Sequence, residues 1–197
     1  KKVFTEWDWG FCTKVGTLFQ PVTEYVTSKL PATLYVNVIS ILISIPLGIL
    51  FGIIAANFKN KWQDHVINIF IVIFISVPAF IYAFLLQYII GFKLNLLPLV
   101  MNSGTDYFTW DMFKSMLPAV FSLSFGSIAG YARGTRAELT EVLTGEYMLL
   151  ARTKGLTKSQ ATVRHALRNS MVPIFPSIIG EFISVLSGSL VIEKIFS

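Results

Sequence analysis

Apolar residues in this chain gather into four long stretches separated by shorter polar segments. Three of the stretches contain no charged residue and the fourth is interrupted only by Glu181; they cover residues 30–58, 66–92, 115–132 and 169–192. A helix that crosses a bilayer needs roughly 20 apolar residues. No strand-like alternation of apolar and polar positions competes over such lengths. The pattern predicts four membrane-spanning helices, near residues 32–57, 66–91, 115–135 and 171–192.

The composition agrees with a membrane protein. Of the 197 residues, 54% are hydrophobic and 14% are charged, whereas soluble domains carry about 25% charged residues. This excludes a disordered chain and argues against a soluble enzyme. The single cysteine, Cys12, excludes an internal disulfide, and the two histidines without an H-E-x-x-H motif predict no metal site.

Positive charge is concentrated in two polar segments, 57–65 and 133–168. Together they hold nine of the 16 Lys and Arg but four of the 11 Asp and Glu, while the rest of the chain has seven of each sign. The two segments lie on one side of the membrane if the four helices alternate in direction. The positive-inside rule then makes both cytoplasmic and places segments 1–29 and 92–114 outside. Charge placed in this way indicates a membrane surface, and we expect no nucleic-acid partner.

Small residues recur at four-residue spacing in two of the predicted helices. Gly48 and Gly52 form one such pair, and Gly126, Gly130 and Gly134 form a longer stripe. Small residues at this spacing let helix backbones approach closely in lipid. We expect all five glycines to serve in helix packing.

Two prolines and one acid lie within the predicted spans. Pro46 and Pro78 are expected to kink their helices. Glu181 is the one charge inside a span, and such groups are costly in lipid and often functional. Glu181 either lines a pathway, hydrogen-bonds a neighbouring helix, or is a protonated or interfacial carboxylate.

The long segment between the third and fourth spans has its own helix signals. Thr135 and Glu138 have the spacing of a capping box, which predicts a helix start. Gly155 is placed to end this helix in a left-handed conformation, and Thr157 with Gln160 forms a second capping box. The segment is therefore expected to fold as helix, glycine turn and helix. A hairpin that only lies on the membrane surface would have the same pattern.

This segment resembles a known motif. EYMLLARTKGLTKSQATVRHALRNSMVPI, residues 146–174, is similar to the cytoplasmic EAA loop of permease subunits of binding-protein-dependent ABC importers, in the form of the oligopeptide/dipeptide branch. GTLFQPVTEYVTSKLPATL (16–34) resembles the stretch that leads into the second span of that family. VIEKIFS (191–197) resembles its VVETVFS motif. The likeness therefore extends over nearly the whole chain.

The resemblance implies a fold. It implies an all-α polytopic membrane protein with the type I permease fold of ABC importers and at least four transmembrane helices. The permease domain would cover residues 30–197, with its coupling loop at about 134–170, after an extracytoplasmic segment 1–29. Further helices are expected before Lys1 and after Ser197.

The sequence also departs from the general EAA pattern. Leu149 stands where that pattern has a glutamate, six residues before Gly155, and Arg168 stands where it has a proline, which is delayed to Pro173. The oligopeptide branch shares these changes. A contact made by that glutamate is therefore not transferred to this chain.

The resemblance implies a transport function. The chain would be the pathway-forming, non-catalytic subunit of an ATP-driven oligopeptide importer. If Glu181 lines that pathway, as one of its open alternatives has it, it would contact the peptide amino terminus. A helix over about 140–154 would dock on an ATPase subunit. The contacts that the resemblance implies are Glu146, Tyr147, Ala151, Arg152, Lys154 and Gly155.

Partners would supply the energy and the substrate. The chain contains no G-x-x-x-x-G-K-[ST] motif, so ATP and Mg²⁺ are expected on two partner ATPase subunits and no cofactor on this chain. A homologous second permease and an extracytoplasmic peptide-binding protein complete the expected assembly in the cell membrane.

Other functions stay open at this point. A permease for nickel or glutathione would share the loop. A secondary transporter driven by an ion gradient would need inverted repeats with broken helices or several intramembrane charges, and an intramembrane enzyme would need a catalytic pair within the spans.

Overall fold

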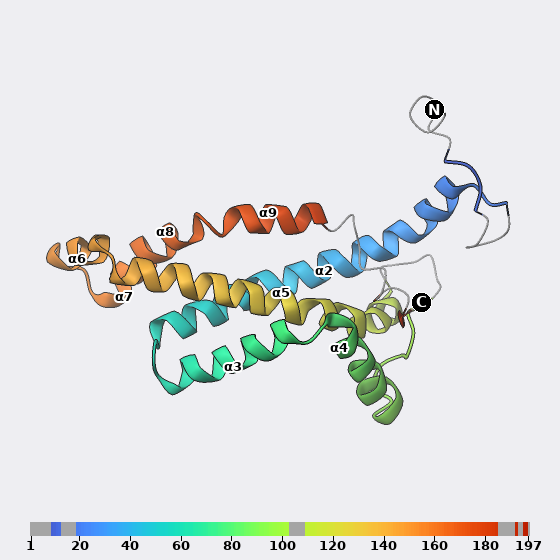
Figure 1. Ribbon diagram of the computed structural model, residues 1–197, viewed down its shortest axis with the longest axis horizontal. Helices are drawn as coiled ribbons and strands as arrows, with labels where there is room; N and C mark the ends of the chain where they lie inside the picture. Colours follow the sequence, from blue (N-terminus) through green and yellow to red (C-terminus); the bar gives the residue numbers. More distant parts are fainter. Residues whose placement is uncertain (1–8, 13–18, 103–108, 185–191, 193–194, 197) are drawn as a thin grey trace.

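The chain is a bundle of long helices. The computed structural model describes residues 9–12, 19–102, 109–184, 192 and 195–196, and these form no strand beyond an isolated β-bridge between Phe11 and Pro21. The elements in Figure 1 are α2 (Val22–Asn57), α3 (Trp62–Ser76), α4 (Ala79–Leu86), the π-helix η1 (Gln87–Lys93), α5 (Trp110–Thr144), α6 (Glu146–Thr153), α7 (Lys158–Ala161), the π-helix η2 (Thr162–Ala166), α8 (Leu167–Met171) and α9 (Phe175–Ser184). The prediction of an all-α membrane protein is confirmed.

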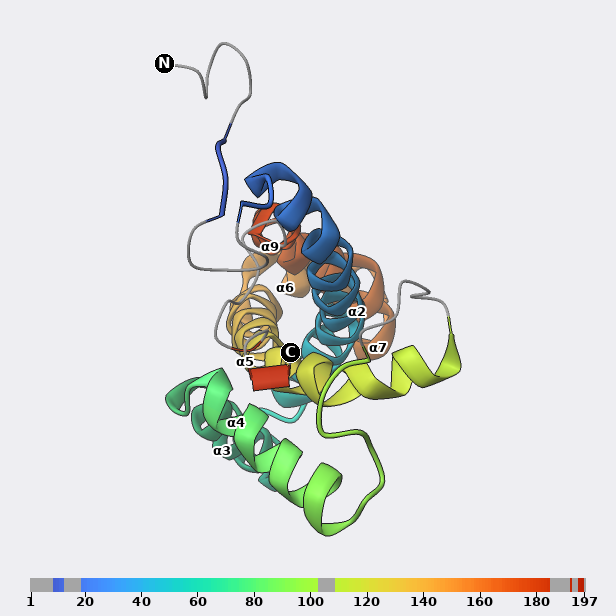
Figure 2. The same ribbon diagram turned by 90° about the vertical axis from the view of Figure 1, so that its right-hand side faces the viewer.

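Two helices are long and apolar enough to cross a membrane by themselves. These are α2 with 36 residues and α5 with 35, and at 1.5 Å per residue both exceed a hydrocarbon core of about 30 Å. They lie together at the centre, with α9 on one side and the α3–α4 arm on the other (Figures 1 and 2). Helix α9 is a shorter apolar helix, and the predicted continuation of the fourth span over 185–191 lies outside the described residues.

The second predicted span is not one helix. Helix α3 ends at Ser76 and α4 begins at Ala79, and the two arms are bent by 98°. Pro78 has no N–H to donate within a helix, and a residue that precedes proline disfavours the α conformation; Val77 is accordingly extended. The expected kink is therefore a complete break. By contrast, α2 continues through Pro46.

Backbone contact between α2 and α5 is unusually close at two glycines. A Cβ atom added to Gly48 would lie 2.5 Å from Cβ of Tyr131 and 2.8 Å from the carbonyl oxygen of Ile128. One added to Gly52 would lie 2.5 Å from Cβ of Thr135. At these positions only glycine lets the helices meet, which is the basis of small-residue packing in membranes.

Buried serines continue the same interface toward the first half of α2. The hydroxyls of Ser40 and Ser124 lie 3.0 Å apart, and both residues are buried. The Ser124 hydroxyl also lies within hydrogen-bond distance of the Val120 carbonyl oxygen one turn earlier, at 2.7 Å, and of the Ser40 carbonyl oxygen across the interface, at 3.4 Å. The hydroxyl of Ser44 donates to the Ser40 carbonyl oxygen at 2.6 Å. Small polar residues thus satisfy their hydrogen bonds while they keep the helices close.

The other glycine stripe faces a different environment. A Cβ atom added to Gly126, Gly130 or Gly134 would meet no atom of the described residues within 4 Å. These glycines were expected to pack against other helices, but within the described part of the chain they border open space. The two sets of glycines therefore differ in what surrounds them.

A second core lies at the end of the bundle remote from α6. Ile192 and Phe196, close to the end of the chain, are buried against Val36, Met112 and Met116. The cluster joins the C-terminal residues to the first half of α2 and the start of α5. The two central helices are thus held together at this end also.

Alanine substitution should separate the two classes of glycine. We expect Gly52→Ala to destabilise the protein by roughly 1–3 kcal/mol, because the new methyl group overlaps α5 and the helices must move apart. Gly130→Ala makes the same chemical change in a helix where the methyl group has room, and it should be neutral or stabilising. The melting temperatures of the purified proteins in detergent measure the difference. Equal effects at the two positions would contradict the assigned packing.

Candidate functional site

Helix α5 extends beyond the apolar run into the predicted cytoplasmic segment. It ends at Thr144, so the expected helix start at Thr135 is wrong. Thr135 lies inside α5 and is buried against Gly52. The backbone N–H groups that follow it are part of the helix and are not free to be capped, and its hydroxyl has no partner among the described residues. The capping-box spacing occurs there inside a helix.

A short helical hairpin follows α5. Helix α6 begins at Glu146 and ends at Thr153, so the helix expected over 140–154 is in fact the end of α5 and a separate α6. Gly155 has φ +84°, the left-handed conformation that was predicted. The Thr157 N–H donates to Oε1 of Gln160 at 3.1 Å, and the Gln160 N–H donates to the Thr157 hydroxyl at 3.3 Å. This reciprocal pair confirms the second capping box.

One face of α6 is fixed to the rest of the chain. Met148 and Ala151, three residues apart and so on one side of the helix, are buried in a cluster with Leu139 of α5 and Ala56 at the end of α2. Small side chains of α7 and η2, Ala161 and Ala166, close the cluster. The hairpin is therefore packed onto the ends of both central helices.

The opposite face of α6 carries two adjacent leucines whose side chains are exposed. Leu149 is 62% exposed and Leu150 is 56% exposed. Exposed apolar groups that are rimmed by polar residues often mark an interaction surface. Here Glu146 and Lys154 flank the leucines and are exposed. We call this surface, Glu146, Leu149, Leu150 and Lys154, the α6 face.

The predicted contact residues do not all lie on this surface. Glu146, Lys154 and Gly155 are exposed, whereas Ala151 is buried inside the hairpin and has a packing role there. The side chains of Tyr147 and Arg152 lie outside the described residues. Leu149 and Leu150, which are exposed on this surface, were not among the predicted contacts. The sequence pattern that could have indicated them is an apolar pair on the side of the helix opposite to Met148 and Ala151, where a helix with one buried face is exposed.

An ion pair between the buried Asp64 and the partly buried Arg136 ties α3 to α5 before the hairpin. Arg136 donates from Nε to Oδ1 of Asp64 at 2.6 Å and from Nη2 to Oδ2 at 2.8 Å. The Asp64 carboxylate also accepts from the Asn60 N–H at 2.9 Å and from the Asn68 amide at 2.7 Å. With Asp64 only 1% exposed, all its oxygens are used within the chain. Bidentate pairs of this kind are geometrically specific.

The ion pair also perturbs the acid. Asp64 precedes the apolar run that starts at Val66, and the hydrogen bonds from Arg136 are the largest cause that lowers the pKa of its carboxyl to about 2. Burial acts in the opposite direction and is outweighed. Asp64 therefore stays ionised at neutral pH. From the sequence alone, Asp64 and Arg136 are only two charges in separate polar segments, and the pair between them was not predicted.

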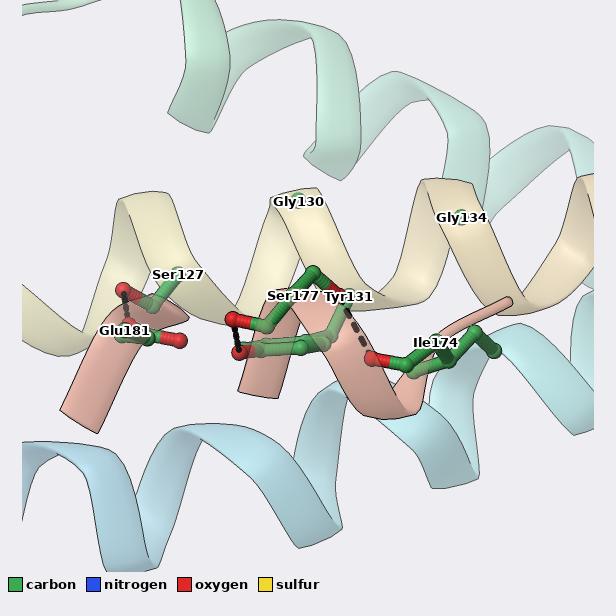
Figure 3. A pocket seen from close by; sticks show the side chains of 7 residues that line it. All are labelled: Ser127, Gly130, Tyr131, Gly134, Ile174, Ser177 and Glu181. Atoms are coloured by element: carbon green, nitrogen blue, oxygen red, sulfur yellow. Dashed lines mark hydrogen bonds between the residues drawn. The ribbon is translucent and has the colours of Figure 1, made fainter. Parts of the chain in front are cut away.

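Glu181 faces a groove between α5 and α9. The groove is lined by Ser127, Gly130, Tyr131, Gly134, Ile174, Ser177 and Glu181, with a volume of about 290 Å³ (Figure 3). We call it the Glu181 groove. The Ser127 hydroxyl donates to Oε1 of Glu181 at 2.6 Å, and the Tyr131 hydroxyl donates to the Ser177 carbonyl oxygen at 3.4 Å. Of the open alternatives for Glu181, a hydrogen bond to a neighbouring helix is present.

Metal ligands are not gathered in the described part of the chain. No group of three His, Cys, Asp or Glu side chains lies close enough there to hold an ion. The two features with functional geometry among the described residues are thus the α6 face and the Glu181 groove. Helix α5 lines the groove and packs against α6 through Leu139.

A family model matches most of the chain. The family described as binding-protein-dependent transport system inner membrane component matches residues 48–197. The match begins at Gly48 in the α2–α5 interface, and it includes the ion pair, the hairpin and the Glu181 groove. The match therefore includes both the α6 face and the Glu181 groove.

Individual relatives point in the same direction. The dipeptide transport system permease protein of Lactococcus lactis is 36% identical over 191 residues, which are 95% of this chain and 60% of the relative. The glutathione transport system permease proteins of Escherichia coli K12 and Salmonella choleraesuis are 34% and 35% identical over 178 and 180 residues, each 90% of this chain and 56% of the relative. The chain thus spans a little over half the length of these curated relatives.

Removal of one partner of the ion pair should be more harmful than removal of both. Arg136→Met leaves the buried Asp64 carboxylate without its cation, and we expect a loss of about 3–5 kcal/mol of stability. The double variant Asp64→Asn/Arg136→Met should recover much of that loss, because the Asn60 N–H still finds an acceptor. Arg133→Met, an exposed arginine on the same helix, is the matched control. Thermal unfolding in detergent is measured for the wild type, the single variants Asp64→Asn and Arg136→Met, their double variant and the control. Additive losses of the two single variants in the double variant would refute the coupling.

Proposed function

The chain belongs to the family of binding-protein-dependent transport system inner membrane components, and from this premise we propose that it is the membrane-spanning subunit of an ATP-driven peptide importer. It forms part of the translocation pathway and receives mechanical work from a separate ATPase. One observation carries the proposal: a single helix, α5, borders the Glu181 groove and ends at the exposed α6 face.

The geometry supports transmission along α5. Ten residues separate Gly134, at the end of the Glu181 groove, from Thr144, and ten residues of helix span about 15 Å. A hydrogen-bonded helix moves as a rigid body over this distance. Because Met148 and Ala151 fix α6 to α5, a pull on the α6 face displaces α5 rather than the hairpin alone.

The ion pair lies between the two features. Arg136 stands two residues after Gly134 and eight before Thr144, so Asp64 attaches α3 to the part of α5 that would move. In the proposed cycle, α3 and α5 therefore tilt together. Access to the groove would then alternate between the two sides of the membrane.

The proposed partners follow from the exposed α6 face and from the lack of a phosphate-binding motif in this sequence. The chain has no phosphate-binding loop, so two ATPase subunits would bind ATP and Mg²⁺ and carry out the hydrolysis. The chain itself would be non-catalytic. A second, homologous permease and an extracytoplasmic peptide-binding protein would complete the importer. The excess of Lys and Arg in 57–65 and 133–168 supports a cytoplasmic location for these segments.

A peptide is the substrate class that the relatives favour. The named relatives transport dipeptide or glutathione, and glutathione is itself a short peptide. A nickel permease gains no support from the described residues, which gather no metal-ligating cluster. A transporter driven by an ion gradient gains none from the family, which depends on a binding protein.

The leucines of the α6 face should anchor the ATPase. In the double variant Leu149→Ser/Leu150→Ser, we expect the amount of ATPase subunit that copurifies with the permease to fall about tenfold or more, because central apolar anchors dominate such interfaces. ATP-dependent peptide uptake into vesicles should fall in parallel. Leu94→Ser/Leu96→Ser alters two equally exposed leucines remote from α6 and is the matched control.

Charged residues near the α6 face provide a second test of the same interface. Reversal of charge at Arg152 and Lys154 is expected to weaken ATPase assembly and peptide uptake together. If both the leucine variant and the charge-reversal variant keep normal assembly, the ATPase does not dock on α6. The coupling role assigned to this helix would then be wrong.

A further inference from the structure

The Glu181 groove holds an acid without a cation among the described residues. Its lining consists of hydroxyl residues, two glycines, Ile174 and Glu181, and it includes no Lys, Arg or His. The one ion pair within the described ranges joins Arg136 to Asp64. A carboxylate inside a spanning helix is costly unless it pairs with a cation or faces a water-filled cavity. The hydrogen bond from Ser127 orients the carboxylate but brings no positive charge to it.

Several oxygen acceptors converge on the same side of the groove. Figure 3 shows that the carboxylate oxygen of Glu181 that is not bonded to Ser127 lies toward the Tyr131 hydroxyl, which in turn lies beside the Ser177 carbonyl oxygen. A carboxylate, a hydroxyl oxygen and a carbonyl oxygen are all acceptors. An ammonium group offers three N–H donors and no acceptor, so its donors match this arrangement.

The shape of the groove suits an extended ligand. Gly130 and Gly134 leave two positions on the α5 side of the groove without a side chain, and a Cβ atom at either would meet no described atom within 4 Å. A volume of about 290 Å³ is at the lower end of small-molecule pockets. It admits the first residues of a peptide with their backbone against α5, but not a folded domain.

We infer that the Glu181 groove binds the α-ammonium group of the transported peptide. Glu181 pairs with the ammonium, Ser127 holds the carboxylate in place, and Tyr131 with Ser177 provides the remaining acceptors. The inference rests on the proposed function, since it names the part of a peptide that this groove recognises. It makes Glu181 a residue that discriminates peptides with a free amino terminus from blocked ones.

Uptake of two peptides by the complete importer tests this inference. The importer is reconstituted in proteoliposomes, with its binding protein outside and ATP inside, on the side of the ATPase subunits. Uptake of trialanine and of Nα-acetyl-trialanine is then measured. In Glu181→Gln we expect uptake of trialanine to fall about tenfold and uptake of the acetylated peptide to change less than about twofold, since only the charge-assisted contact is lost. The wild-type and Glu181→Gln importers are tested with the same binding protein, so the preference of the binding protein for one peptide cancels in the comparison.

Matched variants separate recognition from structure. Glu141→Gln neutralises an exposed acid of α5 outside the groove and should leave the ratio of the two uptake rates at the wild-type value. Glu181→Asp keeps the charge and should restore part of the preference. Gly130→Val places a side chain into the groove at a position where a Cβ atom meets no described atom within 4 Å, and it should lower uptake of both peptides while the complex still assembles.

The outcomes distinguish the inference from the function on which it rests. Normal uptake with an unchanged ratio in Glu181→Gln overturns the inference alone. Equal loss for both peptides, or failure of Glu181→Gln to assemble with the second permease, assigns Glu181 to structure and overturns it also. Wild-type uptake in Gly130→Val does the same, because the groove would then lie off the pathway. If the wild-type importer takes up neither peptide with ATP, the proposed function fails first.

Discussion

The close approach of α2 and α5 is the contact on which the other elements depend. Lipid tails are as apolar as the helices, so no hydrophobic force brings the two together, and dispersion at short range must do so. That requires a surface without bulk, which α2 provides at Gly48 and Gly52, and without unpaired polar groups, which Ser40 and Ser124 satisfy between themselves. Helices α3, α4 and α8 pack against α5, and α9 packs against α2.

Helix α5 has one closely packed face and one open face. The face toward α2 is filled until only glycine fits on the partner helix, whereas the face that carries Gly130 and Gly134 is empty within the described structure. The first arrangement gives a rigid helix, and the second gives room beside it for Glu181 and the groove. A rigid helix beside a cavity is suited to change the cavity when its far end is moved. The α6 hairpin is attached at that end.

The charged residues at this end serve more than topology. Arg136 contributes to the positive charge that orients the chain, yet its guanidinium is committed to the buried Asp64 carboxylate. A bidentate pair on a buried carboxylate is specific in geometry even where its net contribution to stability is small. It therefore fixes the position of α3 relative to the part of α5 that leads to the hairpin.

Much of this protein could be predicted from its sequence, because local and one-dimensional properties decide those features. Apolar length decides that α2 and α5 span a membrane, and the capping chemistry of Thr157 with Gln160 and the left-handed Gly155 depend on neighbours a few residues away. Tertiary structure alone decided the rest. The same small-residue spacing packs at Gly52 and stays open at Gly130, a capping-box pattern at Thr135 lies inside a helix, and loop charges become a buried pair, because each outcome depends on which helix lies opposite. That is a property of three-dimensional contact which periodicity along one helix does not contain.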